Sequence, residues 1–221
     1  MANTLIPIQT YTLSSATSSV TFSNIPQNYT DLKLVVSARS DRSGARGYVQ
    51  VTFNGATTNA TQRYTIGDGS SASSSTGTNN WCMIIPGASQ TANTFSNVDV
   101  YIPNYTSSNY KSFSADSVQE DNTTAAFQVM TAGLWSVGTA ITSISLFHNA
   151  DNSASFVSGS TFTLYGISNG VKATGGTLTV AGGYAYHTFT STANFLPSVK
   201  ITNAETLVIA GGGGAGARFG G

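Results

Sequence analysis

Apolar and polar residues alternate along most of the chain, and convincing helical periodicity is absent from the sequence. Between Leu32 and Arg39 every even-numbered position is apolar. A period of two places successive side chains on opposite faces of a β-strand, so that one face can be buried. The pattern therefore predicts an all-β protein. Its core is expected to include Leu34, Val36, Phe53, Val100, Phe127, Val129, Leu146, Phe162 and Leu164.

Turns rich in Ser, Asn and Gly separate the expected strands. Asn54 and Gly55 form the clearest hairpin-turn signal, because both residues tolerate a positive φ. Residues 70–78 contain no apolar anchor and are expected to form an exposed, mobile loop. Many short strands at regular spacing indicate a sandwich or a barrel. We expect strands at residues 5–13, 20–23, 32–39, 48–53, 61–66, 80–85, 95–102, 111–118, 126–135, 141–148 and 161–167.

The composition changes after residue 167. Residues 168–176 resemble a linker, and about forty residues with short apolar runs follow before the glycine tract Gly211–Gly214. So short a segment buries little core by itself. A glycine tract is either a flexible spacer or a segment that becomes ordered when it packs against copies of itself or a partner. We therefore expect three parts: a sandwich at residues 1–168, a small β-hairpin appendage at 169–210 and a glycine-rich segment at 211–221. Within the appendage, strands are expected at residues 177–180, 184–189, 198–201 and 206–210.

The charge content points to a particular kind of surface. Charged residues make up 8% of the 221 residues, and the formal net charge is +0. Uncharged hydroxyl and amide surfaces are common in extracellular β-proteins and virus particles, whereas cytosolic enzymes usually rely on charge for solubility. A zero net charge leaves self-association unopposed, and we expect a closed homo-oligomer with a trimer favoured. No basic stripe suits nucleic acid.

The sequence shows no recognisable targeting signal. The N-terminus lacks the basic and apolar regions of a signal peptide, and no stretch approaches the roughly 18 apolar residues of a membrane helix. We therefore expect no membrane insertion. Cys82 is the one cysteine, which excludes a disulfide within the chain.

Each candidate chemical site has a structural alternative that we favour. His148 and His187 lack the partners that a zinc site or a catalytic triad needs, and ordinary strand histidines are expected. The carboxylates Asp116, Glu120 and Asp121 could hold calcium, but a solvated turn is favoured. Residues 39–46 carry three arginines that could contact a phosphate or an acidic sugar, but a solvated turn in which Asp41 pairs locally is favoured.

Aromatic residues and glycines are the expected interface residues. Tyr101, Tyr105, Tyr110, Tyr184 and Tyr186 could stack on sugar rings, although a strand core or a subunit interface is the favoured use for most of them. No catalytic, cofactor-binding or metal-binding residue is predicted, and no cofactor. The residues expected at an interface are Tyr184, Tyr186, Gly211, Gly212, Gly213 and Gly214.

Several motifs resemble a domain of structural proteins from tailed bacteriophages. The opening segments at residues 20–26 and 29–39 resemble its start, and Trp135 with residues 138–144 and 159–167 resembles its closing strands. The later residues, from Thr174 to the glycine tract, resemble the glycine-rich segment of phage tail-fibre and adhesin proteins. The resemblance implies a jelly-roll-like antiparallel β-sandwich located on a virion.

The function implied by this resemblance is structural and non-enzymatic. A tail-fibre or tail-associated protein for assembly or host attachment is the first expectation, with other virion proteins and a host surface glycan as the expected partners. A capsid decoration or head-fibre protein is the alternative, and a carbohydrate-binding domain is the third.

Overall fold

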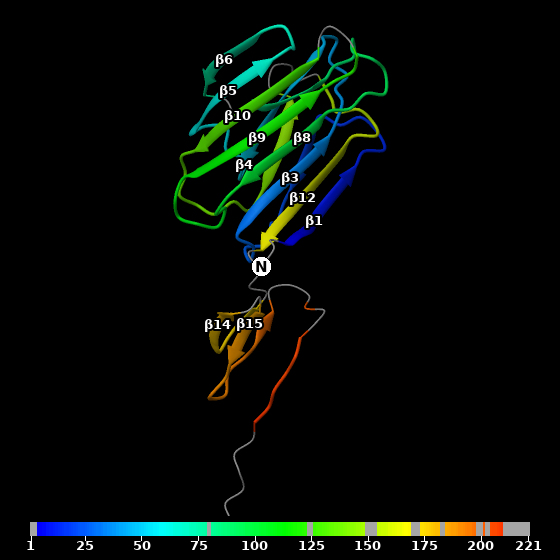
Figure 1. The fold of residues 1–221 in the computed structure, drawn as a ribbon. Helices are drawn as coiled ribbons and strands as arrows, with labels where there is room; N and C mark the ends of the chain where they lie inside the picture. Colours follow the sequence, from blue (N-terminus) through cyan, green and yellow to red (C-terminus); the bar gives the residue numbers. More distant parts are fainter. Residues whose placement is uncertain are drawn as a thin grey trace, which may run out of the picture. The chain divides into compact units, whose positions relative to one another are not determined.

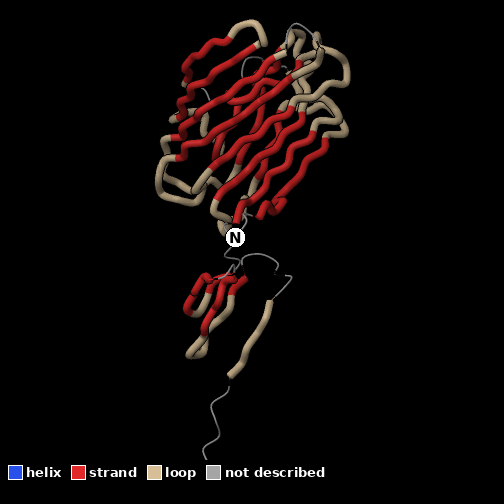
Figure 2. The backbone as a smooth tube through the Cα atoms, in the orientation of Figure 1, coloured by secondary structure: helices blue, strands red, loops and turns tan. Residues whose placement is uncertain are grey.

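In the computed structural model the chain divides into two compact units, residues 1–170 and residues 171–221, and each is described by itself. The described residues are strands, turns and loops, with no helix among them (Figure 2). None of them therefore belongs to a helix of the length and apolarity needed to cross a bilayer. The structure describes residues 4–78, 81–122, 126–148, 154–168, 173–181, 184–197, 201 and 204–209.

The described part of the first unit contains twelve strands. They are β1 (Thr4–Thr12), β2 (Ser19–Phe22), β3 (Asp31–Ser37), β4 (Arg46–Phe53), β5 (Ala60–Gly67), β6 (Ala72–Gly77), β7 (Trp81–Pro86), β8 (Asn97–Ile102), β9 (Lys111–Gln119), β10 (Phe127–Trp135), β11 (Ile144–His148) and β12 (Thr161–Ser168).

These strands form two antiparallel sheets. One sheet has the order β1-β12-β3-β8-β9-β10-β5-β6 (Figure 1), and the other has the order β2-β11-β4-β7. The pairs β1·β12, β2·β11, β3·β8 and β4·β7 are nested, as in one long hairpin whose two arms are rolled together into two sheets. Nested pairing of eight strands in two sheets is the topology of a jelly roll. The expected jelly-roll-like sandwich is therefore confirmed, and β5, β6, β9 and β10 widen its first sheet.

Alternation along the strands builds the core between the sheets. In β3, for example, Leu32, Leu34 and Val36 are buried, while the residues between them are half-exposed. The expected core residues are buried with one exception. Phe127 is only half-buried, because it is the first residue of β10, where its ring is covered by the Arg46 guanidinium at 4.5 Å.

The serine-rich segment forms a strand, contrary to the loop expected there. Strand β6 pairs with β5 as the edge of the larger sheet, from Gln62 opposite Gly77 to Gly67 opposite Ala72. All but the last of its residues are exposed, so backbone hydrogen bonds and a tight turn hold the strand, and apolar burial contributes little.

The turn expected at Asn54 and Gly55 is confirmed, but the expected hairpin is wrong, because the turn does not join neighbouring strands. Both residues adopt a positive φ, 52° and 71°, and the Ala56 amide donates to the Phe53 carbonyl at 2.9 Å. The strands on either side belong to different sheets. The turn therefore carries the chain from one layer of the sandwich to the other.

The second unit contains two small two-stranded sheets among its described residues. Strand β13 (Ala173–Thr174) pairs with β16 (Leu196–Pro197), and β14 (Thr177–Ala181) pairs with β15 (Tyr184–Thr188). Residues 206–209 form no strand, so the strand expected at 206–210 is wrong over its described part. Residues 198–200 and the glycine-rich segment 211–221 lie outside the described residues.

Candidate interaction surfaces

The described part of the second unit has almost no core of its own. Among its described residues only Ala173 is buried. Leu207, Val208 and Ile209 are 84–86% exposed, and we call these three residues the apolar strip. Further large apolar side chains are exposed at Leu178, Tyr184, Tyr186, Phe189, Phe195 and Leu196.

Two of the residues expected at an interface lie side by side in this unit. Tyr184 and Tyr186 alternate along β15, opposite Ala181 and Thr179 of β14, and therefore share one face of the hairpin. Their ring centroids are 6.2 Å apart, and the residues are 62% and 51% exposed. We call this pair the tyrosine face. The other expected interface residues, Gly211, Gly212, Gly213 and Gly214, lie outside the described residues.

His187 has a structural role on the opposite face of the hairpin. Its ring packs edge-on against Phe195, with centroids 5.1 Å apart, and its Nδ1 lies 2.8 Å from the Gly175 carbonyl oxygen. His187 therefore helps to connect the hairpin with the segments beside it.

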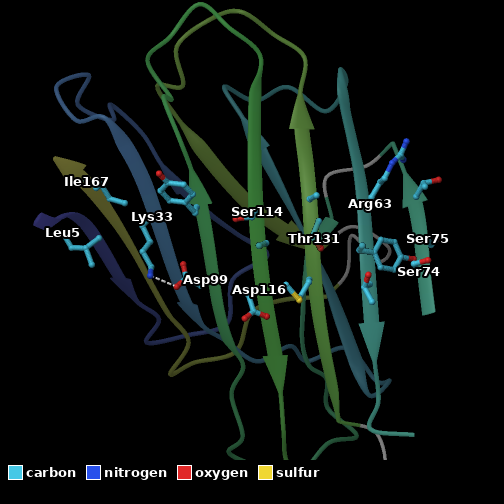
Figure 3. A pocket seen from close by; sticks show the side chains of 17 residues that line it. Leu5, Lys33, Arg63, Ser74, Ser75, Asp99, Ser114, Asp116, Thr131 and Ile167 are labelled. Carbon is cyan, nitrogen blue, oxygen red and sulfur yellow. Dashed lines mark ion pairs between the residues drawn. The ribbon is translucent and has the colours of Figure 1, made fainter. Parts of the chain in front are cut away.

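A second candidate surface is a hollow of about 1030 Å³ on the outer face of the eight-stranded sheet (Figure 3). We call it the sheet groove. Outward-pointing side chains of the sheet line it, with Leu5 at one side of the view and Ser74 and Ser75 at the other. The sequence alone does not predict this hollow, because it depends on which side chains the strand register brings together.

Charged side chains of both signs face the sheet groove. The Lys33 ammonium lies 2.6 Å from Asp99 Oδ2, and Asp116 stands directly opposite Asp99 on the neighbouring strand (Figure 3). Arg63 faces the same hollow from β5. Asp99 was missed by the sequence analysis because it lies seventeen residues before Asp116 and outside the acidic cluster.

The acidic cluster itself is not brought together. Asp116 points outward from the middle of β9, whereas Asp121 is buried and accepts a hydrogen bond from the Thr91 amide at 3.0 Å. Glu120 accepts from the Asn122 amide at 2.7 Å. Over the residues that the structure describes, no group of three or more His, Cys, Asp or Glu side chains could hold a metal ion.

Arg39 is buried, which corrects the solvated turn expected at residues 39–46. Its guanidinium donates to the carbonyl oxygens of Gln90 at 2.8 Å and Thr91 at 2.7 Å, and to both the carbonyl and the hydroxyl of Thr94. Asp41 accepts a hydrogen bond from the Ser155 amide at 2.7 Å and is not paired within its own turn as expected. This arginine therefore holds a loop in place and is not free for a phosphate.

His148 is buried in the sandwich beside Phe156, with ring centroids 4.9 Å apart. By distance and angle, neither ring nitrogen has a hydrogen-bond partner in the described part of the chain. Burial lowers the pKa of His148, and the Asp41 carboxylate opposes this effect only in part. The residue is a core histidine.

The remaining candidate residues fall in three different environments. Tyr105 is fully buried and donates its hydroxyl to the Pro26 carbonyl, and burial raises the pKa of Tyr105 to about 12. Tyr101 lines the sheet groove, and Tyr110 is exposed on the loop before β9. Cys82 lies in β7, and its side chain is outside the described part of the structure.

Comparison with models of protein families finds none that matches this chain. Comparison with curated proteins and comparison with solved structures likewise find no match.

Proposed function

We propose that this chain is a non-enzymatic structural protein of a bacteriophage virion, and specifically a tail-fibre or tail-associated subunit. One observation carries the proposal: in the described part of the second unit most large apolar side chains are exposed, and only Ala173 is buried. A jelly roll joined to a unit whose described residues bury so little apolar surface is the organisation expected of a subunit that completes its fold during assembly.

Copies of the chain are the proposed partners for the second unit. Removing one large apolar side chain from water contributes roughly 1.5–3 kcal/mol, and the apolar strip offers three such side chains per copy. A formal net charge of +0 leaves the approach of copies unopposed at long range. Closed cyclic symmetry buries the same strip in every copy, and we propose a trimer.

The virion assignment is supported by the phage-like motifs in both units and by a surface with few charges. Only 8% of residues are charged, so the exterior relies on hydroxyl and amide groups, as expected of a protein that works outside a cell. The jelly roll then serves as a platform, and the second unit serves assembly or extension.

The test is to find the chain on particles. Mass spectrometry of purified phage particles whose genome encodes this chain should detect it as a stoichiometric component, and a gold-labelled antibody should mark the tail. Label on the head would contradict the tail assignment and favour a capsid decoration protein. Absence of the chain from purified particles would contradict a virion role altogether.

A further inference from the structure

We infer that the sheet groove binds an uncharged oligosaccharide. This site lies wholly within the first unit, and ligand binding there requires no association of copies. The inference therefore goes beyond the proposed structural role and can be tested apart from it.

The strand register gives the groove its shape. One row of outward side chains crosses six neighbouring strands, and small residues in its middle stand between longer ones on both sides. The row is Lys33, Tyr101, Ser114, Ala132, Arg63 and Thr76, each opposite the next. Because neighbouring strands are about 4.8 Å apart, Tyr101 and Arg63 are separated by roughly 14 Å across a floor of Ser114 and Ala132. This trough has its floor at Ser114 and Ala132, and Asp116 and Met130 stand opposite each other in the next outward row of the same two strands.

The volume of the trough suits a short chain of sugar rings. Its volume of about 1030 Å³ lies at the top of the range of roughly 300–1,000 Å³ that is usual for small-molecule sites. A single monosaccharide would leave most of it empty, so we expect an oligosaccharide.

Asp116, one of the two carboxylates in the sheet groove, has no explanation in the stability of the fold. Asp99 and Asp116 are directly opposite each other on neighbouring strands, and like charges in that relation destabilise a sheet. Lys33 compensates Asp99, but Asp116 makes no hydrogen bond or ion pair with the residues that the structure describes. Departures from folding rules of this kind are expected at functional sites.

Arg63 provides the complementary hydrogen-bonding group. It is exposed on β5, faces the groove and likewise has no hydrogen bond or ion pair among the described residues. Arg63 on β5 and Asp116 on β9 are separated by β10, so the two unlike charges stand on different strands of the groove. A ligand in the trough can accept hydrogen bonds from the guanidinium and donate hydroxyls to the carboxylate at once.

The equal numbers of positive and negative side chains in the sheet groove favour an uncharged ligand. The two cations, Lys33 and Arg63, match the two carboxylates in number, so the groove gives a polyanion no net attraction. Adjacent hydroxyls of a sugar suit planar carboxylate and guanidinium groups, each of which makes more than one hydrogen bond. The half-exposed ring of Tyr101 offers an apolar surface to sugar C–H groups. Its hydroxyl donates to Asp31 Oδ2 at 2.8 Å, which fixes the ring before binding.

The geometry favours binding over cleavage. Glycoside hydrolysis uses one carboxyl group that its surroundings keep protonated. Asp99 and Asp116 both lie on the open face of the sheet, and Asp99 is 2.6 Å from an ammonium group. They are therefore suited to accepting hydrogen bonds from hydroxyl groups.

The test is an array of neutral and acidic oligosaccharides probed with the full-length chain, followed by calorimetric titration of the best neutral binder. We expect binding to a neutral oligosaccharide that survives chelation of divalent metal ions. Asp116→Ala and Arg63→Ala should each weaken it about tenfold or more, since each removes a charged hydrogen-bonding group. Ala132→Leu should abolish it by filling the floor of the trough while leaving the buried side of the sheet unchanged.

Ser112→Ala is the matched control, because Ser112 is exposed on β9 two residues from Ser114 and outside the groove. Its affinity should equal that of the parent chain, and the circular dichroism of every variant should be unchanged. Failure to bind any neutral oligosaccharide on the array would overturn the inference. Binding that Ala132→Leu leaves intact would also overturn the inference, and so would binding only to acidic glycans.

Discussion

Buried polar side chains in the sandwich differ in how completely their hydrogen-bonding groups are used. Lys111 is almost fully buried, yet its ammonium donates to the carbonyl oxygens of Ser107, Asn109 and Thr139. Arg39 is similarly satisfied by the loop that it holds. His148 makes no such bond in the described part of the chain. Lys111 and Arg39 therefore stabilise the loops to which they donate hydrogen bonds. Because His148 is buried without such a bond, it should make the stability of the first unit depend on pH.

We predict that His148 weakens the first unit at acidic pH. Burial lowers its folded-state pKa below the ordinary value of 6.5, so the unfolded chain takes up the proton first. The contribution of His148 is therefore complete above pH 6.5 and is lost as the pH falls through the folded-state pKa. Melting temperatures between about pH 7 and about pH 5 should fall less steeply in His148→Phe than in the parent chain. His187→Gln, in the other unit, is the control, and equal slopes for His148→Phe and the parent would refute the prediction.

We predict that Arg39→Lys destabilises the first unit by about 2 kcal/mol or more, because a single ammonium cannot replace the guanidinium fork. The fork reaches carbonyl groups at Gln90, Thr91 and Thr94. Urea unfolding followed by tryptophan fluorescence measures the change. Arg63→Lys is the control, since Arg63 is exposed, and its effect should stay within about 0.5 kcal/mol. A similar free energy of unfolding for both variants would show that the buried fork contributes little.

At the scale of elements, the β5–β6 hairpin depends on one carboxylate. Asp68 Oδ1 accepts hydrogen bonds from the amides of Ser70 and Ser71 at 3.0 and 2.7 Å, and from both hydroxyls. The amides of Ser71 and Ser70, in that order, together with the Ser70 hydroxyl, lower the pKa of Asp68 to about 2. The ionised carboxylate of Asp68 therefore stabilises the turn.

We predict that Asp68→Ala frays this hairpin. Amide hydrogen exchange in β6 should become faster, because its turn loses several hydrogen bonds and the strand has no buried side chains to hold it. In the parent chain the stabilisation by Asp68 should be complete above pH 3.8 and be lost as the pH falls from 3.8 through about 2, where the folded-state pKa lies. Asp116→Ala, exposed on the same sheet, serves as the control. Unchanged exchange in Asp68→Ala would show that strand pairing alone suffices.

How far the sequence predicts an element depends on whether its residues bury apolar side chains. β3 and β12 were predicted because their apolar residues recur with a period of two and face the core. β6 was missed because its serines and threonines carry no such signal. The expected strand at 206–210 was wrong because an apolar run forms no strand without a partner to pair with.

The sheet groove could not be predicted from the sequence either, because its residues come together only in the folded sheet. On the sequence, Asp116 groups with its neighbours in the chain, whereas in the structure it is opposite Asp99 on the neighbouring strand. Arg39 was expected at the surface because arginine is rarely buried unless its charge is paired. Its carbonyl partners, at residues 90–94, could not be anticipated without the fold.

At the scale of the whole molecule, the two units have contrasting means of stability. The first buries a continuous apolar core between two sheets, whereas the second buries only Ala173 among its described residues. The first unit should therefore fold alone. The second should become stable when its apolar strip and tyrosine face are covered by other copies.

The most direct test of this account is the molar mass of the full-length chain, measured by light scattering during size-exclusion chromatography. We predict a mass three times that of the 22.8 kDa chain, and a monomer for the chain ended after residue 168. Leu207→Ser combined with Ile209→Ser should shift the full-length chain toward the monomer, because both substitutions remove apolar area from the strip. A full-length chain that stays monomeric over the whole accessible concentration range would contradict the proposed assembly.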